Sequence, residues 1–247
     1  TSLISPLERL KDFIGMTDIK NSIVKQIIYF LQNLDNETNI MHTVITGSPG
    51  LGKTKLGYLL AEIYYKMNVF MSKNEDKKYI SPITNENIDF KFTIAKRSDL
   101  IGEYVGHTAI KTQKVINSAE GGVLFIDEVY SLGNREKRDA FTKECIDTIN
   151  QNLTEKSDKF LCIVAGYKDD VKECFLDYNK GLERRFPVRF ELESYSSESL
   201  LKILLKFVEE EKWSFSNKDE LLKLIKENEK LLKYQAGDIK TIFQFSK

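Results

Sequence analysis

A chain of 247 residues with 41% apolar side chains is long enough to bury a substantial core, which argues against an intrinsically disordered protein. Its 37 basic and 37 acidic side chains give a net charge of zero, so no global positive field is available to hold a polyanion by counterion release. Three scattered cysteines and two histidines argue against a Cys/His metal site and favour reduced core thiols in a cytosol-like compartment. No apolar run reaches the length of a membrane span and no signal-peptide pattern opens the chain, so we expect a cytoplasmic protein without a membrane partner.

The first hundred residues alternate helical and strand patterns. Apolar side chains recur at three- and four-residue spacing over 17–33, which predicts an amphipathic helix. Residues 42–46 read as a short buried strand that runs into a glycine-rich turn, and a second helical period covers 56–63. Residues 72–87 are polar and are expected to form an exposed loop, after which 90–94 alternate as a strand does.

The alternation continues to about residue 192 and then stops. A helix is expected to end near Ser118, and further strands are predicted at 121–126, 160–165 and 188–192. Helices that alternate with buried strands predict a parallel α/β sheet covered on both faces. From Ser196 onward only helical periods remain, enough for about three helices, so we place a domain boundary near residue 193.

The segment 47–54 reads GSPGLGKT and matches the phosphate-loop pattern G-x-x-x-x-G-K-[ST]. Its glycines let the backbone curl so that successive N–H groups point at an anion, and the helix that follows adds its positive end. Lys53 is expected to meet the β- and γ-phosphates, and Thr54 to ligate Mg²⁺ through its hydroxyl. The alternative is an ordinary turn whose sequence matches the pattern by chance. The other candidate nucleotide-binding residues of the loop are Ser48, Pro49, Gly50, Leu51 and Gly52.

Asp127 and Glu128 follow the apolar run Val123–Ile126, at the carboxyl end of a predicted strand. In open parallel sheets that end is where ligands bind. Asp127 is placed to hold Mg²⁺ through its water shell, and Glu128 to orient and activate an attacking water. The alternative is that the two residues are solvated acids at the end of a strand. The presence of a phosphate loop in the same chain makes that alternative less favoured. The pair favours hydrolysis over phosphoryl transfer to a metabolite, and the sequence therefore predicts an ATPase that uses ATP and Mg²⁺.

Together with the all-helical C-terminal region, these motifs resemble those of AAA+ ATPases. More narrowly, LIGEYVGHTAIKT, GGVLFIDEVYSL, AGYKDD and GLERRF, in that order, are similar to the subgroup of red-type rubisco activase and stage V sporulation protein K. The resemblance implies a P-loop NTPase fold with a nucleotide-binding α/β domain over 1–192 and a small helical lid over 193–247. Because the chain starts at Thr1 and stops soon after Lys240, we expect a piece of a longer protein with a truncated lid.

The same resemblance implies roles for five further residues. Ile14 and Gly15 match the segment that packs near adenine, and Arg185 matches the arginine finger that one subunit inserts beside the γ-phosphate of its neighbour. Tyr167 stands where most of the family carry an asparagine that positions water, and Lys240 replaces the arginine of the second sensor, on the lid. Each role has an alternative. Tyr167 could be a structural residue, and Arg185 could be a solvated surface charge. Lys240 could have no sensing role, because lysine lacks the planar fork of arginine.

Tyr104, Val105 and Gly106 form an aromatic-aliphatic-glycine triplet between the two phosphate motifs. In the resembling family such a loop faces the pore of a ring, usually of six subunits, and grips an extended polypeptide. Tyrosine offers a large apolar face with little rotamer entropy to lose, and Gly102 and Gly106 provide hinges. The alternative buries Tyr104 and Val105 in a turn.

The motifs favour an ATP-driven remodeler: a homo-oligomeric ring, expected to be a hexamer, in which hydrolysis moves Tyr104 along a protein client. A nucleic-acid motor or loader on the same fold is the second hypothesis, and the neutral charge makes nucleic acid the less favoured partner. An ATP-switched scaffold without turnover is the third, made conceivable by Tyr167 and Lys240. A metabolite kinase comes last, because it has no use for an acidic pair followed by an intersubunit arginine.

Overall fold

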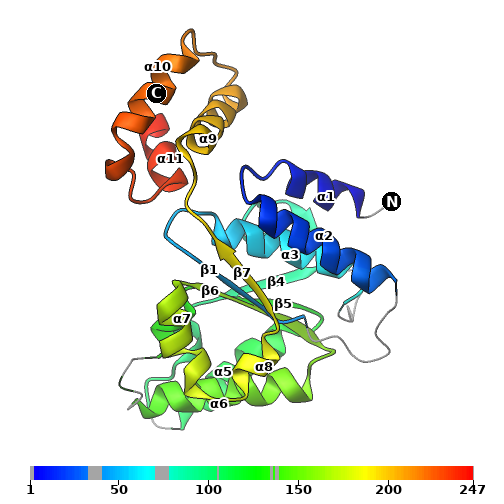
Figure 1. The fold of residues 1–247 in the computed structure, drawn as a ribbon. Coiled ribbons are helices and arrows are strands. Elements are labelled where there is room, and N and C mark those ends of the chain that lie inside the picture. The colour runs from blue at the N-terminus through cyan, green and yellow to red at the C-terminus, as the bar shows by residue number, and fades with distance from the viewer. Residues whose placement is uncertain are drawn as a thin grey trace.

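The computed structural model describes residues 3–32, 41–69, 78–104, 106–133, 136 and 139–246. Its centre is a parallel sheet of five strands in the order β4-β5-β6-β1-β7 (Figure 1). The strands are β1 (Thr43–Gly47), β4 (Lys91–Ala95), β5 (Gly122–Ile126), β6 (Phe160–Gly166) and β7 (Val188–Leu192). This order matters for the site, because β6 separates β1 from β5.

Successive residues of the central strands face two different cores. Phe125 of β5 belongs to the core that α2 and α3 help to form, whereas its neighbours Leu124 and Ile126 belong to the core formed with α5 and α6. A strand that is buried on both faces must be apolar at every position. This requirement explains why β5 and β6 read as continuous apolar runs and why every residue of both strands is buried.

Helices cover both faces of the sheet (Figure 1). On one face lie α1 (Ile4–Lys11), α2 (Thr17–Leu31) and α3 (Lys53–Lys66). On the other lie α4 (Arg97–Leu100), α5 (His107–Ala119), α6 (Ala140–Glu155), α7 (Lys168–Cys174) and α8 (Leu182–Arg185), with the short 3-10 turns η1 (Val129–Leu132) and η2 (Leu176–Tyr178).

After β7 the described chain is entirely helical. The elements are α9 (Ser197–Glu210), α10 (Lys218–Glu227), η3 (Glu229–Leu231) and α11 (Ala236–Phe245). The side chain of Ser196 accepts the N–H of Ser199 and that of Asn217 accepts the N–H of Glu220, so capping residues fix where α9 and α10 begin. Figure 1 shows these helices standing at one end of the molecule, beyond the loop that follows β1.

The predicted parallel sheet flanked by helices and the helical C-terminal part are confirmed. The predicted exposed loop over 72–87 is wrong in part. Residues 70–77 lie outside the described residues, but β2 (Tyr79–Ile80) and β3 (Asn87–Ile88) pair as an antiparallel hairpin. Strands of two residues are too short to show a period of two, which is why the pattern does not reveal them.

Candidate active site

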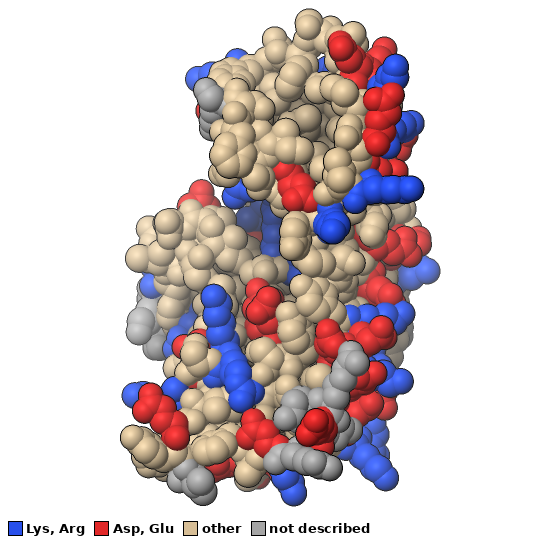
Figure 2. All heavy atoms as spheres, turned by 90° about the vertical axis from the view of Figure 1, so that its left-hand side faces the viewer, with Lys and Arg blue, Asp and Glu red and all other residues tan. Residues whose placement is uncertain are grey.

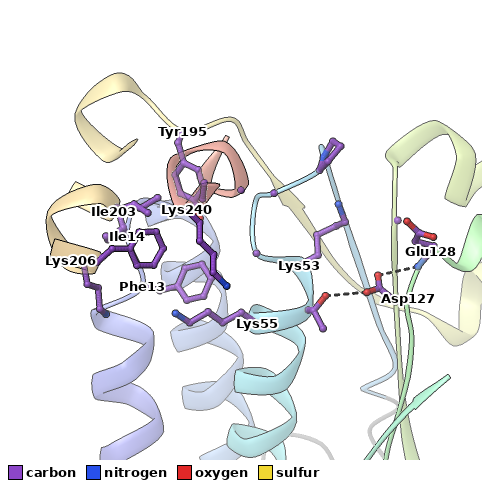
Figure 3. A pocket seen from close by; sticks show the side chains of 18 of the residues that line it. Phe13, Ile14, Lys53, Lys55, Asp127, Glu128, Tyr195, Ile203, Lys206 and Lys240 are labelled. Carbon is purple, nitrogen blue, oxygen red and sulfur yellow. Dashed lines mark hydrogen bonds between the residues drawn. The ribbon is translucent and has the colours of Figure 1, made fainter. Parts of the chain in front are cut away.

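A cavity of about 570 Å³ lies between the carboxyl ends of the central strands and the C-terminal helices (Figure 3). Most of the predicted site residues line it: Ile14, Pro49, Gly50, Gly52, Lys53, Thr54, Asp127, Glu128, Tyr167 and Lys240. They come from segments that lie far apart in the sequence. The parallel strands bring them together because their carboxyl ends share one edge of the sheet.

The phosphate loop joins β1 to α3 by a backbone path that only glycine follows easily. Gly50 and Gly52 have φ of 73° and 87°, in the left-handed region. Gly50 also faces the C-terminal helices at close range, since a Cβ there would lie 1.8 Å from the carbonyl oxygen of Tyr234. Because α3 begins at Lys53, the unpaired N–H groups and positive end of its first turn face the cavity, as an anion site requires.

The ammonium of Lys53 is held by the loop itself. Its Nζ donates to the carbonyl oxygens of Gly47 at 2.9 Å and Ser48 at 2.8 Å, and it lies 5.2 Å from the centre of the Tyr167 ring. Burial lowers the pKa of Lys53, while the nearby Asp127 carboxylate opposes that shift. A phosphate group in the loop would offer this half-buried cation a charged acceptor in place of two carbonyls.

Thr54 and Asp127 are in direct contact. Oγ1 of Thr54 donates to Oδ2 of Asp127 over 3.1 Å, and Oδ1 of Asp127 accepts the N–H of Glu128 over 3.0 Å (Figure 3). Hydroxyl and carboxylate oxygens fit Mg²⁺, which usually takes one or two carboxylates and completes its shell with water and substrate phosphates. In the described part of the chain no three His, Cys, Asp or Glu side chains form a metal cluster, so phosphate oxygens would have to supply much of the coordination.

Glu128 sits in a strained backbone position at the end of β5. Its φ of 50° lies in the left-handed region, which costs a non-glycine residue on the order of 1 kcal/mol. The turn is closed by the N–H of Ser131, which donates to the carbonyl oxygen of Glu128 over 2.7 Å and starts η1. The side chain of Glu128 is exposed to the cavity beside Asp127.

Two tyrosines stand between the phosphate loop and Glu128. The rings of Tyr130 and Tyr167 are stacked, with centres 5.1 Å apart and planes 24° from parallel. Burial and the neighbouring Glu128 carboxylate raise the pKa of Tyr130 far above its usual value. Sequence reasoning missed Tyr130, although its place two residues after Glu128 in a short turn is the signal that would have found it.

The far end of the cavity has an apolar wall with charged side chains beside it. The wall, which suits a planar ring, is made by Phe13, Ile14, Ile203 and Phe207. Lys55 and Lys206 lie next to it (Figure 3). Gly15 does not line the cavity itself. Its φ is 72°, and a Cβ there would touch the ring of Tyr195, which does line the cavity, at 3.5 Å. Phe13, Ile203 and Phe207 were not predicted from the sequence.

The C-terminal helices contribute two kinds of contact. Lys240 of α11 points into the cavity beside Phe13 and Lys55 (Figure 3). Tyr195, at the start of the segment that leads into α9, donates its hydroxyl to the carbonyl oxygen of Leu51 over 3.0 Å. Leu51 is itself buried and lies outside the cavity wall, as does Ser48, so both predicted residues support the loop through their carbonyl groups.

Arg185 does not reach this cavity. It lies on α8, and its Nε donates to Oγ1 of Thr154 on α6 over 2.6 Å. Figure 1 shows α8 and α6 on the side of the sheet away from the C-terminal helices. A role for Arg185 in phosphate chemistry therefore requires the cavity of a second copy.

The loop between α4 and α5 presents Tyr104 to solvent. Its side chain is 66% exposed, so the alternative that buries it in a turn is wrong. The ring meets that of His107 edge-on, with centres 5.6 Å apart. Gly106 has φ of 83° directly before α5 begins, while Val105 lies outside the described residues.

Within the described ranges, no helix combines the length and apolarity needed to cross a membrane. Residues 43–194 match the sequence model of the AAA family, the ATPase family associated with various cellular activities. The chain belongs to the AAA family of ATPases. This AAA ATPase is 42% identical over 246 residues to the putative cfxQ-like protein R730 of Acanthamoeba polyphaga mimivirus, a match that covers 98% of the chain and 56% of the relative.

A second relative is the stage V sporulation protein K of Bacillus subtilis (strain 168), 33% identical over 221 residues, or 86% of this chain and 62% of that one. The predicted subgroup resemblance is thereby confirmed. The chain spans just over half the length of these two relatives. The fold is also that of the FIGL-1 AAA domain in complex with ADP, with a TM-score of 0.61 at 18% identity over 94% of this chain and 70% of that one.

Proposed function

We propose that this AAA ATPase hydrolyses ATP with the help of Mg²⁺ and uses the reaction to remodel or thread a protein client through a ring of identical subunits, six in number. The observation that carries the proposal is the exposed side chain of Tyr104. Its loop is connected by hydrogen bonds to the turn that follows Glu128.

Arg97 makes this connection, and it lies on α4 directly before the Tyr104 loop. Its Nη1 donates to the carbonyl oxygens of Ser131 and Leu132, each at 2.7 Å, and its Nη2 pairs with Oδ2 of Asp139 at 3.2 Å. The two carbonyls belong to η1, the turn that follows Glu128. A movement of η1 therefore carries α4 with it, and α4 leads into the loop that bears Tyr104.

In the proposed reaction Lys53 binds the β- and γ-phosphates, Thr54 and Asp127 hold Mg²⁺, and Glu128 takes a proton from the attacking water. The ion would supply charge stabilisation between the phosphate oxygens. The contact between Thr54 and Asp127 and the exposure of Glu128 beside them support these roles.

We assign the adenine to the apolar end of the cavity, near Ile14, and treat residues 193–247 as a lid over the nucleotide. Lys240 supports this assignment, because it enters the cavity from α11 and adds a cation opposite Lys53. Arg185 is assigned to the neighbour's site. Its position on α8, away from the cavity of its own chain, is what a residue acting in trans requires.

A protein client fits the loop better than a nucleic acid does. Lys111, beside the loop, uses its ammonium to bind the carbonyl oxygens of Ser98 and Ile101 at 2.6 and 3.0 Å. Glu103 adds a negative charge next to Tyr104. The face drawn in Figure 2 carries Lys and Arg interspersed with Asp and Glu, unlike the basic stripe that tracks a phosphate backbone.

Two variants test the proposal. Glu128→Gln should bind ATP without hydrolysing it and accumulate as a ring, seen as an increase in mass by light scattering when ATP is added, with client protein retained. Tyr104→Ala should form the same ring and hydrolyse ATP at the basal rate, but lose stimulation by the client captured with Glu128→Gln. Unchanged client stimulation in Tyr104→Ala, while Glu128→Gln is inactive, would exclude the threading mechanism.

A further inference from the structure

Three lysine side chains converge at the apolar end of the cavity. Lys55 belongs to α3, Lys206 to α9 and Lys240 to α11, and all three line the cavity. Figure 3 shows them reaching the space beside Phe13, and Nζ of Lys55 lies 5.8 Å from the centre of the Phe13 ring. A helix of the α/β part and two helices of the C-terminal part therefore direct positive charge at one place.

The described carboxylates do not balance this charge. None of the three ammonium groups forms an ion pair with a described Asp or Glu. Asp12 lines the cavity but attracts Lys20, which lies outside it. Glu210 attracts Lys55, yet desolvation and the neighbouring Lys206 lower the pKa of that lysine overall. The apolar end of the cavity is left with an excess of positive charge, which favours an anion.

The nucleotide orientation proposed above leaves Lys55 and Lys206 without an anionic partner. With the phosphates at Lys53 and the adenine against Phe13, the ribose would lie between them, next to Lys55 in the first turn of α3. Adenine and ribose carry no charge at neutral pH, because the negative charge of ATP is on its phosphates. An ammonium group binds a charged oxygen about twice as strongly as a neutral one, so a further phosphate is the group that fits here.

We propose that Lys55, Lys206 and Lys240 form a second anion site, and that this lysine cluster selects adenine nucleotides with a phosphate on the ribose, at the 2′ or 3′ position. Such a phosphate would contact ammonium groups from both parts of the chain and hold the C-terminal helices against the nucleotide. ADP that carries it has no γ-phosphate to hydrolyse, so it would compete with ATP and inhibit hydrolysis. The proposal rests on the function proposed above for the cavity.

Isothermal calorimetry tests the proposal with three probes: ADP, ADP with an added 3′-phosphate, and ADP with an added 2′-phosphate. We expect at least one ribose-phosphorylated form to bind about tenfold more tightly than ADP at about 50 mM salt, because its phosphate meets two or more ammonium groups. The difference should shrink toward about 300 mM salt, where screening weakens contacts between exposed charges. The same form should inhibit ATP hydrolysis at a lower concentration than ADP does.

Three variants assign the effect to the lysine cluster. The double variant Lys55→Gln, Lys206→Gln should bring the ratio of the two affinities close to one, and Lys206→Glu should make the ribose-phosphorylated form the weaker ligand. Lys202→Gln is the matched control and should keep the preference, because Lys202 is an exposed lysine of α9 that does not line the cavity. None of the three lysines is buried, so each variant should keep the thermal midpoint of the parent.

Equal affinities for ADP and both ribose-phosphorylated forms overturn the proposal. So does a preference that the double variant retains, or one that Lys202→Gln loses to the same extent. Inorganic phosphate added to the ADP titration distinguishes a free anion from one on the ribose. Binding of ADP that free phosphate strengthens as much as the attached phosphate does would overturn the selection of a ribose phosphate.

The ADP titration also separates this inference from the proposed function. A parent protein that fails to bind ADP contradicts the nucleotide site itself. ADP binding that Lys53→Ala abolishes, together with no preference for a ribose phosphate, supports the nucleotide site and contradicts only the second anion site.

Discussion

The hydroxyl of Tyr195 donates a hydrogen bond to the carbonyl oxygen of Leu51, 3.0 Å away and 144 residues earlier in the chain. The N–H of Tyr195 donates to the side chain of Gln235 over 3.0 Å. One residue therefore holds both the phosphate loop and the turn before α11, and it connects the phosphate loop to the C-terminal helices.

Tyr195→Phe should loosen that connection. Removing the hydroxyl leaves the buried Leu51 carbonyl without this donor, which costs about 1–2 kcal/mol in the free energy of unfolding measured by urea denaturation. We also expect weaker ATP binding, measured by calorimetry, because the loop loses its anchor. Tyr64 is buried on α3 and its hydroxyl donates to Gln26 over 3.2 Å, so Tyr64→Phe should cost a similar free energy of unfolding without changing the affinity for ATP. Equal affinities in the two variants would contradict the anchoring role of Tyr195.

Gly50→Ala should displace the C-terminal helices. A Cβ at Gly50 would lie 1.8 Å from the carbonyl oxygen of Tyr234, so either the loop or the turn must move. Gly106→Ala is the comparison, because its φ of 83° carries a similar backbone penalty but no described atom lies within 4 Å of its Cβ. We expect urea denaturation to show about 1 kcal/mol lost in Gly106→Ala and clearly more in Gly50→Ala. Equal losses in the free energy of unfolding would mean that the turn at Tyr234 moves aside without a measurable cost.

Thr54 allows a matched pair of substitutions that tests the magnesium site. Thr54→Ser keeps the hydroxyl that contacts Asp127 and should retain most of the hydrolysis rate. Thr54→Val keeps the shape but removes the oxygen ligand, and we expect a loss of about a hundredfold or more in kcat and a shift of the Mg²⁺ titration to higher concentration. Similar Mg²⁺ titrations for both variants would show that Thr54 does not hold the ion.

His42 should make the fold sensitive to mild acid. It is 1% exposed, its Nδ1 accepts the N–H of Cys162 over 3.0 Å, and burial lowers its pKa from 6.5 to about 4. Between these values the unfolded chain binds a proton that the folded chain does not, so stability falls as pH drops. The loss from this residue is about 2 kcal/mol between pH 7 and pH 5, and about 3 kcal/mol once the pH is below 4.

Urea denaturation at pH 7 and pH 5 measures this effect. His42→Asn keeps an acceptor near the N–H of Cys162 but does not titrate, so its free energy of unfolding should be lower at pH 7 and change less toward pH 5. An identical change in both proteins would assign the acid sensitivity to other groups.

The parts of the site that could be predicted are those that short contiguous segments encode. The loop 47–54 and the pair Asp127 and Glu128 each stand directly after a segment that the sequence predicts to be a buried strand. The helix predicted over 17–33 is α2, which ends at Leu31, because its apolar stripe has the period that packing on a sheet demands.

The parts that could not be predicted depend on contacts between distant segments. Tyr195 meets Leu51, and Tyr130 meets Tyr167, through the order of the strands, which local patterns do not specify. Phe13 looks like any core aromatic until the cavity beside it is known. The role proposed for Arg185 cannot be seen in a single chain, because the group that it is predicted to contact would belong to another copy.

The place of β6 between β1 and β5 has a consequence for sequence variation. Whatever side chain follows Gly166 must fill the space between the phosphate loop and the turn that carries Tyr130. A shorter side chain at position 167 would leave the ring of Tyr130 without its stacking partner, and a smaller side chain at position 130 would do the same to Tyr167. Positions 130 and 167 are therefore expected to change together among relatives, as a pair that evolution selects by their combined size.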